Sequence, residues 1–510
     1  MKKHTQSPYE SSKVSYKPSG IDYLGLIPHH WEVARSGLIY KNISSGTTPQ
    51  SDNDEYYKNG NIFWINSGDL NDSVLTNSKN KITQRAIMAY SVLKIFPKGS
   101  LIIAMYGATI GKVSILGIDA CTNQACCVLC ESKYLNTRFV FYYFIAKRQD
   151  LISMAYGGGQ PNISQDIIKN FKIPLPPLQE QKEIVEFLDS KCEKIQNYID
   201  KKQKLITLLQ EKKQALINKV VTKGLNPNIE FKNSGIEYLG LIPHHWEAVK
   251  VKFTAYVKGR IGFHGLNSNE FRYDEGAYLV TGNDFDNNEV MWDKCRRVSE
   301  ERFYEDPNIH LQNNDLLITK DGTIGKTAIV NNCPKQATLN SGIFLVRTLK
   351  EMCFVKYLFF IINSQYFKEF VNVKTSGSTI KHLYQSDFHD LKIPLPPLQE
   401  QKQIANFLDE KCEKINSAIE KTKRQIELIK EYKNTLINEA VCGRVACHTE
   451  PLGEVSHNAE SKRDFSPTAQ NDKKRTIQNG KEDFCHTERS EVSTMESGFF
   501  ANAQNDKKKN

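Results

Sequence analysis

The sequence lacks a long apolar run. None of its hydrophobic stretches approaches the roughly 18 residues that a membrane-spanning helix requires. The N-terminal segment MKKHTQSPYESSKVS has no apolar core of the kind that defines a signal peptide. The chain has 510 residues, of which 39% are hydrophobic and 25% charged, a composition typical of a globular protein with several domains. We therefore expect a cytoplasmic protein of two to four domains.

Clustered metal ligands are also scarce. The 12 cysteines are scattered along the chain, and scattered thiols in a reducing compartment are more often small buried side chains than disulfide partners. One group, Cys121, Cys126, Cys127 and Cys130, has a spacing that suggests a metal site. The matching segment of the second half has isoleucine, phenylalanine and arginine at the last three of these positions. We therefore expect the cysteines on a buried strand and no bound metal.

Motifs for three kinds of catalysis are incomplete. The segments 107–112 (GATIGK) and 322–327 (GTIGKT) resemble a P-loop, but the spacing between their glycines is too short to hold a triphosphate. A tight turn between two strands explains these glycines, and each lysine would then project from the tip of a loop. Glu180 and Glu400 match part of a nuclease motif, but they lie in a predicted first helical turn, where glutamate stabilises the helix dipole. The Leu-Pro-Pro-Leu segments lack the polar residue with which an adenine methyltransferase holds an amino group. We expect no catalytic site in this chain.

One segment of the sequence occurs twice. IPLPPLQEQKEIVEFLDSKCEKI at 173–195 and IPLPPLQEQKQIANFLDEKCEKI at 393–415 are identical at 19 of 23 positions. A match of this extent indicates an internal duplication. The prolines suit an extended lead-in and a first helical turn but not a helix interior. Each copy therefore predicts a helix that begins near Leu178 or Leu398.

Each predicted helix carries a single apolar stripe, with spacings of three and four residues, and a glycine (Gly224 or Gly443) at its end. About 45 residues make a rod of roughly 65 Å, and such a helix is rarely stable alone. We expect the two helices to form an antiparallel coiled coil. The alternative is that each helix lies on its own domain. The expected seam comprises Ile184, Leu188, Ile195, Leu209, Ile404, Leu408, Ile415 and Ile429.

A second repeated segment precedes each globular half: IDYLGLIPHHWEVAR at 21–35 and IEYLGLIPHHWEAVK at 236–250. Its adjacent histidines have no acidic or cysteine partner at helical spacing, so we interpret it as a packing anchor built on Trp31 and Trp246. The expected organisation is a flexible N-terminus (1–19), a first domain (20–172), a first helix (173–224), a second domain with its lead-in (225–392), a second helix (393–445) and a disordered low-complexity tail (446–510).

The two globular halves are predicted to share one fold. In the first half, 61–70, 99–107 and 112–117 are typical of strands and 139–152 of a buried helix, and the second half repeats this order. We therefore expect an α/β (α+β) protein with two duplicated β-rich domains separated by two long antiparallel helices. The loops of the two halves differ strongly, and one scaffold with two unlike sets of loops typically binds two different targets.

The charge balance is moderately basic. Residues 1–446 carry about 11 more basic than acidic side chains, which is compatible with binding a phosphate backbone. Basic and amide side chains in the variable loops are suited to contacts with phosphates and base edges. The candidates for DNA binding are Lys41, Arg85, Lys112, Gln160, Asn162, Lys258, Arg260, Arg272, Lys320, Lys326, Lys374 and Lys381.

These motifs together resemble a known family. The paired G-L-I-P-x-x-W lead-ins, the strand followed by G-x-I-G-K, and the duplicated I-P-L-P-P-L-x-E-Q-x-x-I-x-x-F-L-D helix over residues 20–445 are similar to the DNA specificity subunit of type I restriction-modification systems. The resemblance implies that each domain reads one half of a split double-stranded DNA target. It also implies that the helices recruit two methyltransferase subunits, which restriction subunits join. The chain itself would be non-catalytic, and S-adenosylmethionine, ATP and Mg would belong to its partners.

Two alternatives remain open from the residues alone. A coiled-coil adaptor would bridge proteins without reading DNA sequence, and a stand-alone nuclease would cut DNA without a partner. Neither alternative explains the tail (446–510), in which CHTE and AQNDKK each occur twice. This tail has few large apolar residues and therefore lacks the material for a core.

Overall fold

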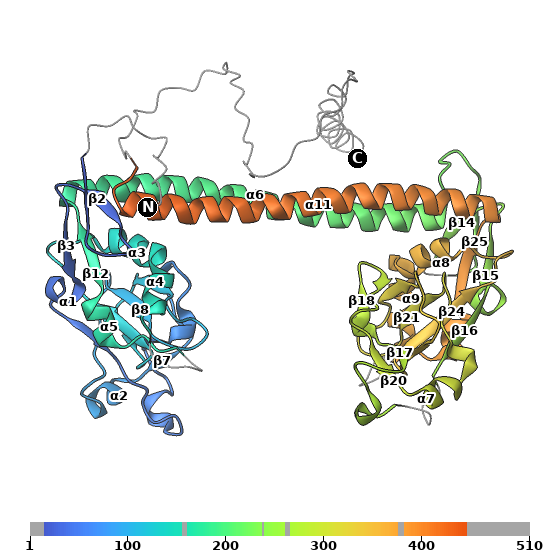
Figure 1. Cartoon of the computed structure of the whole chain (residues 1–510), viewed down its shortest axis with the longest axis horizontal. Coiled ribbons are helices and arrows are strands. Elements are labelled where there is room, and N and C mark those ends of the chain that lie inside the picture. The colour runs from blue at the N-terminus through green and yellow to red at the C-terminus, as the bar shows by residue number, and fades with distance from the viewer. Residues whose placement is uncertain (1–14, 156–160, 237–238, 261–265, 376–381, 446–510) are drawn as a thin grey trace, which may run out of the picture. The chain divides into compact units, whose positions relative to one another are not determined.

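The computed structural model describes residues 15–155, 161–236, 239–260, 266–375 and 382–445 (Figure 1). These residues form two β-rich domains and two long helices in the order domain, helix, domain, helix. The expected tail and most of the expected flexible N-terminus lie outside the described residues. Within the described ranges, no helix combines the length and apolar character needed to cross a membrane.

The two long helices begin at the leucines that the sequence predicts. Helix α6 spans Leu178–Lys223 and helix α11 spans Leu398–Val441. Each follows a proline in extended conformation, which has no N–H to leave unpaired. Gly224 and Gly443 follow their ends with φ of 72° and 70°. At Gly443 a β-carbon would lie 2.5 Å from Cγ of Pro28, so no other residue fits this helix end.

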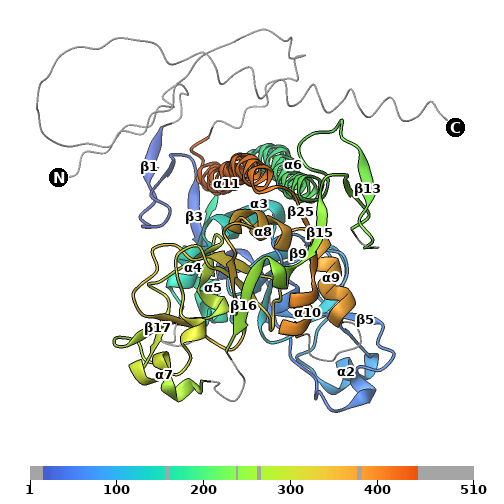
Figure 2. The ribbon, with the colours of Figure 1, turned by 90° about the vertical axis from the view of Figure 1, so that its right-hand side faces the viewer.

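Helices α6 and α11 lie side by side and run antiparallel, as expected (Figures 1 and 2). The start of α6 shares a buried cluster with the end of α11, and the end of α6 shares another with the start of α11. Between these clusters the helices contact each other through isoleucines. From one end of the pair to the other, the buried clusters to which both helices contribute contain Leu188 and Ile437, then Ile199, Ile206, Ile419 and Ile426, and then Val220 and Ile404.

The expected seam residues differ in burial. Ile184, Leu188, Ile195, Ile404 and Leu408 are buried. The other three are half-buried: Leu209, Ile415 and Ile429. At its ends each helix also packs on a domain, because the clusters that hold Leu188 and Leu408 include domain side chains. The coiled coil and its alternative therefore both apply, in different stretches of the same helices.

The first domain contains two mixed sheets beside helix α3 (Thr137–Ala146). The five-stranded sheet has the order β4 (Ile43–Ser45), β11 (Cys126–Leu129), β8 (Leu101–Ala104), β9 (Val113–Leu116) and β6 (Val74–Leu75). The three-stranded sheet has the order β10 (Ala120–Thr122), β5 (Ile62–Ile65) and β7 (Lys81–Ile82), with α2 (Gln84–Ala89) after β7. Cys126 and Cys127 are buried on β11, as the sequence predicts, but Cys121 is buried on β10 of the other sheet and Cys130 follows β11 and is half-buried.

The second domain repeats both sheets. Its larger sheet has the order β16 (Ala255–Gly259), β24 (Ile343–Thr348), β21 (Leu316–Thr319), β22 (Thr327–Ile329), β19 (Glu289–Val290) and β18 (Phe285–Asp286). Its smaller sheet has the order β20 (Arg296–Val298), β17 (Ala277–Val280) and β23 (Ala337–Leu339), with α7 (Glu300–Tyr304) after β20. The α/β fold class and the duplication are therefore confirmed.

Each predicted buried helix is in fact two helices. Helix α3 ends at Ala146 and α4 (Arg148–Ser153) follows, while α8 (Val355–Ile362) and α9 (Gln365–Thr375) form the second pair. The first break lies at Lys147, which is 4% exposed. Its ammonium donates to Oδ1 of Asn438 on α11 and to the carbonyl of Tyr23, both at 2.6 Å. The break thus places a domain residue against the helix pair, a tertiary contact that helical periodicity does not reveal.

The lead-in segments pair with strands that precede the long helices. Strand β3 (Glu32–Arg35) pairs with β12 (Lys172–Leu175), and β15 (Glu247–Lys250) pairs with β25 (Lys392–Leu395). The other short elements are β1 (Tyr16–Pro18), β2 (Leu26–Pro28), β13 (Phe231–Asn233), β14 (Leu241–Pro243), α1 (Ser36–Ile39), α5 (Gln165–Asn170) and α10 (Gln385–Asp390). Each domain is therefore closed by the strand that leads into its own helix.

Trp31 and Trp246 anchor the lead-ins, as expected. Both indoles are fully buried. The indole N–H of Trp31 donates to both carboxylate oxygens of Glu180 at 3.1 Å, and that of Trp246 donates to Glu400 at 3.2 Å. The neighbouring His30 lies 2.9 Å from the same Glu180. The sequence analysis found no acidic partner at helical spacing, and the partner that the structure shows instead comes from a distant helix.

A glutamine that follows each glutamate joins the helix to its domain. Gln181 is fully buried, accepts from the backbone N–H of Asn136 at 2.7 Å, and donates to the carbonyls of Tyr134 and Pro176. Gln401 makes the same three bonds in the second half. Buried polar groups need such partners. The repeated Glu-Gln pair therefore fixes each domain on the first turn of its helix.

Candidate functional site

Each domain presents a glycine turn of the same form. Residues 107–111 connect β8 to β9, and residues 322–325 connect β21 to β22. The first and last glycine of each turn have φ between 66° and 86°, a region that glycine alone adopts readily. Each turn connects two strands and not a strand and a helix, so the interpretation as a tight turn is confirmed.

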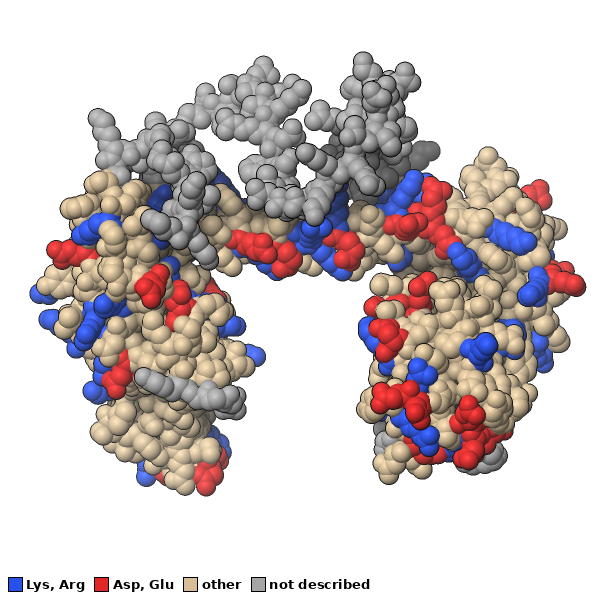
Figure 3. Space-filling model, in the orientation of Figure 1, with Lys and Arg blue, Asp and Glu red and all other residues tan. Residues whose placement is uncertain are grey.

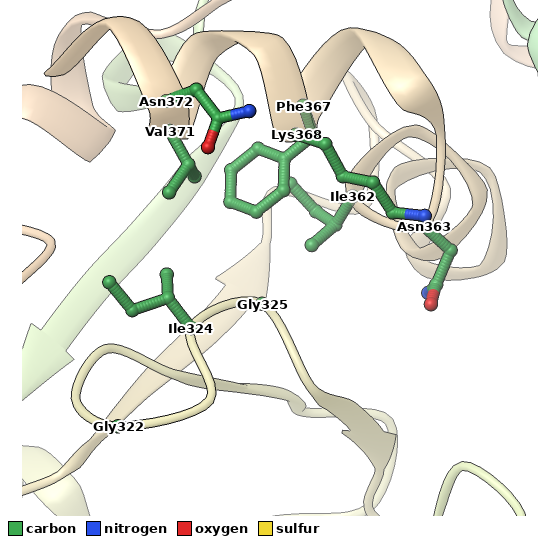
Figure 4. Close-up of a pocket in the computed structure, with 9 residues that line it drawn as sticks. All are labelled: Gly322, Ile324, Gly325, Ile362, Asn363, Phe367, Lys368, Val371 and Asn372. Carbon is green, nitrogen blue, oxygen red and sulfur yellow. The ribbon is translucent and has the colours of Figure 1, made fainter. Parts of the chain in front are cut away.

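Both turns pack on the helix that follows the domain's first buried helix. A β-carbon on Gly111 would lie 2.9 Å from Cγ of Arg148 on α4, and one on Gly325 would lie 3.2 Å from the ring of Phe367 on α9. Beside the second turn is a small cavity of about 280 Å³. Figure 4 shows Ile324 from the turn facing Phe367 and Val371 from α9. Among the described residues, the cavity lining holds no carboxylate, histidine or cysteine, and its one ionisable side chain is Lys368.

A second segment of each domain runs beside the turn. We call it the return segment, residues 161–164 in the first domain and 382–384 in the second. The backbone N–H of Ile163 donates to the carbonyl of Met105 at 2.8 Å, and that of Leu383 donates to the carbonyl of Lys320 at 3.0 Å. Gln165 and Gln385 then tie each segment to the first strand of the large sheet. Turn and return segment form one rigid feature, here called the turn site.

The residues at the turn sites differ between the domains. In the second, the carboxylate of Asp321 accepts a hydrogen bond from Nδ1 of His382 and lies 3.3 Å from the ammonium of Lys320. In the first, Tyr106 and Asn162 occupy the corresponding places. The sequence analysis found Asn162 and Lys320 but missed Tyr106, Asp321 and His382. Aligning the two glycine turns would have revealed Tyr106 and Asp321, but not His382, which lies about 60 residues further along the chain.

The DNA-binding candidates of the first domain do not gather at one place. Lys41 and Asn162 are exposed and Lys112 is half-exposed, beside the glycine turn. Arg85 is exposed on α2 and pairs with Glu55 at 3.1 Å. Gln160 lies outside the described residues. Asn162 lies in the return segment of the turn site and Lys112 directly follows its glycine turn, while Lys41 and Arg85 lie elsewhere in the domain.

In the second domain the candidates are more often engaged by the protein. Lys258 is half-buried on strand β16 and not in a loop. Lys374 pairs with Asp387 at 3.1 Å, and the Lys320 side chain is only 13% exposed. Arg272 is exposed. Lys381 lies outside the described residues.

Two candidates contradict the expectation of free cations on loops. The Lys326 ammonium does not project from the loop tip, because it donates to the carbonyls of Gly282 and Phe285 at 2.9 Å. Arg260 is 4% exposed and donates to the carbonyl of Leu339 and the hydroxyl of Thr338. Burial lowers the pKa of this guanidinium. Arg260 is therefore a structural residue that holds β23.

The visible surface is not dominated by one charge. Figure 3 shows Lys and Arg side chains interspersed with acidic ones on the visible face of both domains. Many of these charges form ion pairs, such as Arg302 with Glu270 and Lys250 with Asp390. Exposed pairs of this kind contribute little to stability, but they reduce the net field. Discrimination at such a surface must come from side-chain geometry more than from bulk charge.

The cysteines have the properties of core residues. Burial raises the pKa of Cys121 and Cys127 to about 12, so the thiolate form that binds metals is disfavoured. In the part of the chain that the structure describes, no group of three or more histidine, cysteine, aspartate or glutamate side chains is placed to hold a metal ion. Glu180 and Glu400 accept hydrogen bonds from the buried tryptophans.

Exposed apolar side chains line one flank of the helix pair. They are Tyr198, Leu205 and Leu208 on α6 and Leu428 and Tyr432 on α11, each between 39% and 58% exposed. An α-helix turns about 100° per residue. Each of these side chains therefore lies roughly 100° to 180° around its helix axis from the seam residues, and the direction of this rotation is the same on both helices. The domains contact the opposite flank, through residues such as Asp189 and Asp409. The apolar flank is therefore turned away from the domains.

Two copies of one domain with unlike turn sites, fixed to opposite ends of an antiparallel helix pair, define a two-headed recognition protein. Comparison with family models matches residues 28–210 and 265–428 to the type I restriction modification DNA specificity domain. The chain belongs to this family and carries two copies of its domain. The duplication fits the reading of a two-part DNA target.

Individual relatives agree with this assignment. The chain is 25% identical over 427 residues to the type I restriction enzyme MjaVIII specificity subunit of Methanocaldococcus jannaschii, covering 82% of this chain and 94% of that protein. It is 24% identical to the MjaIX specificity subunit of the same organism, covering 83% and 95%. A structure from work on complex assembly and conformational transition of the type I R-M system aligns with a TM-score of 0.64 at 17% identity, covering 82% and 99%. That structural likeness concerns the fold.

Proposed function

We propose that this chain is the specificity subunit of a type I restriction-modification enzyme and that each domain reads one half of a bipartite duplex target. The proposal rests on one observation: the two domains share the same framework but carry different residues at their turn sites. If the two domains bound the same ligand, nothing would require Tyr106 and Asn162 to be replaced by Asp321 and His382. The antiparallel helices relate the two domains by a pseudo-twofold axis. Proteins with twofold symmetry bind two half-sites on duplex DNA that are related in the same way.

The helix pair acts as the spacer between the half-sites. Each domain is fixed to the first turn of one helix by its Trp-Glu and Gln contacts. It also packs on the last turn of the other helix: Lys147 donates to Asn438 of α11, and Tyr357 donates to the carbonyl of Val221 on α6. With both helices engaged at both ends, the distance between the domains is set by helix length and not by flexible linkers.

The apolar flank of the helix pair is the docking surface for two modification subunits. Leu208 and Leu428 correspond in the duplication and are 47% and 58% exposed. The pseudo-twofold places them on the same face of the pair, toward its two halves. Exposed apolar side chains on a helix pair are suited to bind partner helices. Two equivalent leucines provide two such surfaces, so we infer two modification subunits, with restriction subunits joining that assembly.

The chain itself contributes no chemistry in this proposal. S-adenosylmethionine, ATP and Mg belong to the modification and restriction subunits, and the complex works in the cytoplasm, where its DNA is. Of the groups that a nuclease would need, the repeated Glu180 and Glu400 are committed to tryptophan contacts. The chain's own residues position the target DNA and the partner subunits relative to each other.

The proposal is tested with the full chain purified alone and together with a cognate modification subunit. Both preparations are incubated with duplexes of randomised sequence, and bound DNA is sequenced. We expect a two-part motif with a fixed gap, adenine methylation within it when the modification subunit and S-adenosylmethionine are present, and no cleavage by the chain alone. Binding without any sequence motif would indicate an adaptor, and cleavage with Mg alone would indicate a nuclease.

The docking surface has its own variants. Leu208→Glu with Leu428→Glu places charge on the apolar flank and should abolish copurification of the modification subunit. Thr207→Glu with Lys423→Glu is the matched control, because these positions lie on the flank that faces the domains. Retention of the modification subunit by the first pair, or its loss from the control alone, would contradict the assignment.

A further inference from the structure

The two turn sites place two side chains at the same structural position in each domain. Tyr106 and Asp321 both precede the first glycine of the turn. Asn162 and His382 both precede the residue whose N–H bonds back to the turn strand, Ile163 or Leu383. We infer that this pair, Tyr106 with Asn162 and Asp321 with His382, determines which base each domain selects at one matching position of its half-target. The inference rests on the proposed function.

Rigid placement makes these side chains suited to reading bases. In both domains the strand before the turn is buried in the large sheet. The return segment is fixed on one side by a backbone hydrogen bond and on the other by Gln165 or Gln385. Discrimination between bases requires donors and acceptors held in one geometry. The framework supplies that geometry and leaves the identity of two side chains per domain free to vary.

The first domain presents an amide. Asn162 is exposed, and its side chain makes no hydrogen bond within the described residues. An asparagine amide offers one donor group and one acceptor, which match N7 and N6 of adenine in the major groove. Tyr106 beside it is half-buried, and burial raises the pKa of its phenol. The phenol therefore keeps its proton at neutral pH and remains a hydrogen-bond donor.

The second domain presents an imidazole whose orientation is fixed. Nδ1 of His382 donates to Asp321, and the other carboxylate oxygen of Asp321 is 3.3 Å from the Lys320 ammonium. Both oxygens of Asp321 are thus occupied, and Nε2 of His382 is the atom that remains for a ligand among the described contacts. The Tyr384 ring, 4.6 Å from the imidazole, supports its edge. A neutral imidazole would accept from the exocyclic amine of cytosine or adenine, and an imidazolium would donate to guanine.

Asp321 acts through His382 and is a positioning residue. Its counterpart Tyr106 has no histidine beside it, and the counterpart of Lys320 is the buried Met105. Replacing Asp321 with asparagine leaves a group of the same size but removes the negative charge that holds the Nδ1 proton. We therefore expect Asp321→Asn to change preference at the same base pair as a substitution of His382, not to weaken binding to all sequences alike.

The experiment selects bound duplexes from a library with a randomised centre, using the full chain with its modification subunits. We expect His382→Asn and Asp321→Asn to change preference at one base pair of one half-target by about ten- to a hundredfold, with the other half unchanged. Asn162→His should do the same in the other half only. His244→Asn, an exposed histidine on the second lead-in, is the matched control and should select the wild-type sequence.

The outcomes separate this inference from the proposed function. If wild-type protein selects no two-part motif, the proposed function fails. If it does, but Asn162→His and His382→Asn select the same motif with preferences changed less than about twofold, the turn sites do not read bases and the inference fails alone. Changes in both half-targets from one substitution would also overturn it. Should His382→Asn unfold, as judged by its Tm, Asn162→His tests the pair in the other domain.

Discussion

Lengthening the helix pair should lengthen the gap between the two half-targets. The sequence alone suggests adding four residues to one helix, after Thr207 or Thr422. The structure requires a matched change in both helices, because both ends of the pair are held by buried clusters and one longer helix would have to bulge. Repeating residues 204–207 in α6 and 418–421 in α11 meets this condition. It duplicates the facing pair Ile206 and Ile419 and so extends the seam.

The size of the effect follows from helix geometry. Four residues add about 6 Å and turn the helix about 40° beyond one full turn, so the apolar stripe is nearly preserved. Base pairs are about 3.4 Å apart, and the gap should therefore grow by one or two base pairs. A seven-residue insertion adds about 10.5 Å and returns the stripe to within about 20°. That variant should lengthen the gap by about three base pairs.

Methylated sites in genomic DNA are the measurement, with each variant expressed beside its modification subunits. The two half-sequences should remain those of the wild type, since no insertion touches a turn site. A four-residue insertion in α6 alone is the control and should fail to assemble. If a doubly extended variant methylates sites with an unchanged gap, helix length does not set the spacing. Altered half-sequences would show that the helix pair also positions individual base contacts.

Three further predictions concern the scaffold. Leu188→Asp with Leu408→Asp should destabilise both ends of the helix pair, since losing each fully buried leucine costs roughly 2–5 kcal/mol before the buried charge is counted. If unfolding by denaturant were unchanged, these leucines would not belong to the buried seam. Replacing residues 251–391 with those of a relative should change one half of the methylated motif, and a change in both halves would exclude independent readers. Trp31→Phe removes the N–H that donates to Glu180 and should lower the free energy of unfolding by about 1–3 kcal/mol. Thermal or urea unfolding measures this change. Adding Glu180→Gln to the Trp31→Phe variant should lower the free energy of unfolding little further.

Repetition made much of the architecture predictable. Because the chain contains its own second copy, the positions that match between copies mark the framework and the positions that differ mark the variable loops. The start of each helix at Leu178 and Leu398 follows from the prolines before it, a local effect of fixed φ and a missing N–H. Its stop at glycine is equally local. The pairing of the two helices was predictable because a long, narrow apolar stripe has few other ways to be buried, although the stripe alone does not fix the direction in which they run.

Contacts between distant segments decided what the sequence left open. Arg260 is a basic residue of the kind that contacts DNA, but its side chain is buried. Its guanidinium donates to carbonyl and hydroxyl oxygens of β23, a strand that follows about 80 residues later in the sequence. Lys326 is recruited by the carbonyls of Gly282 and Phe285. In both cases the oxygen atoms that accept hydrogen bonds from the cationic side chain come within its reach only when the sheet forms.

The turn sites show the same division. The sequence by itself determined that each domain has a tight glycine turn after a buried strand, since the glycines and the apolar run are adjacent in the chain. Only the tertiary structure brought the return segment, some 55 to 60 residues later, beside that turn and thereby paired Asp321 with His382. A hydrogen bond between residues so far apart depends on how the whole domain packs, and no local preference of either residue encodes it.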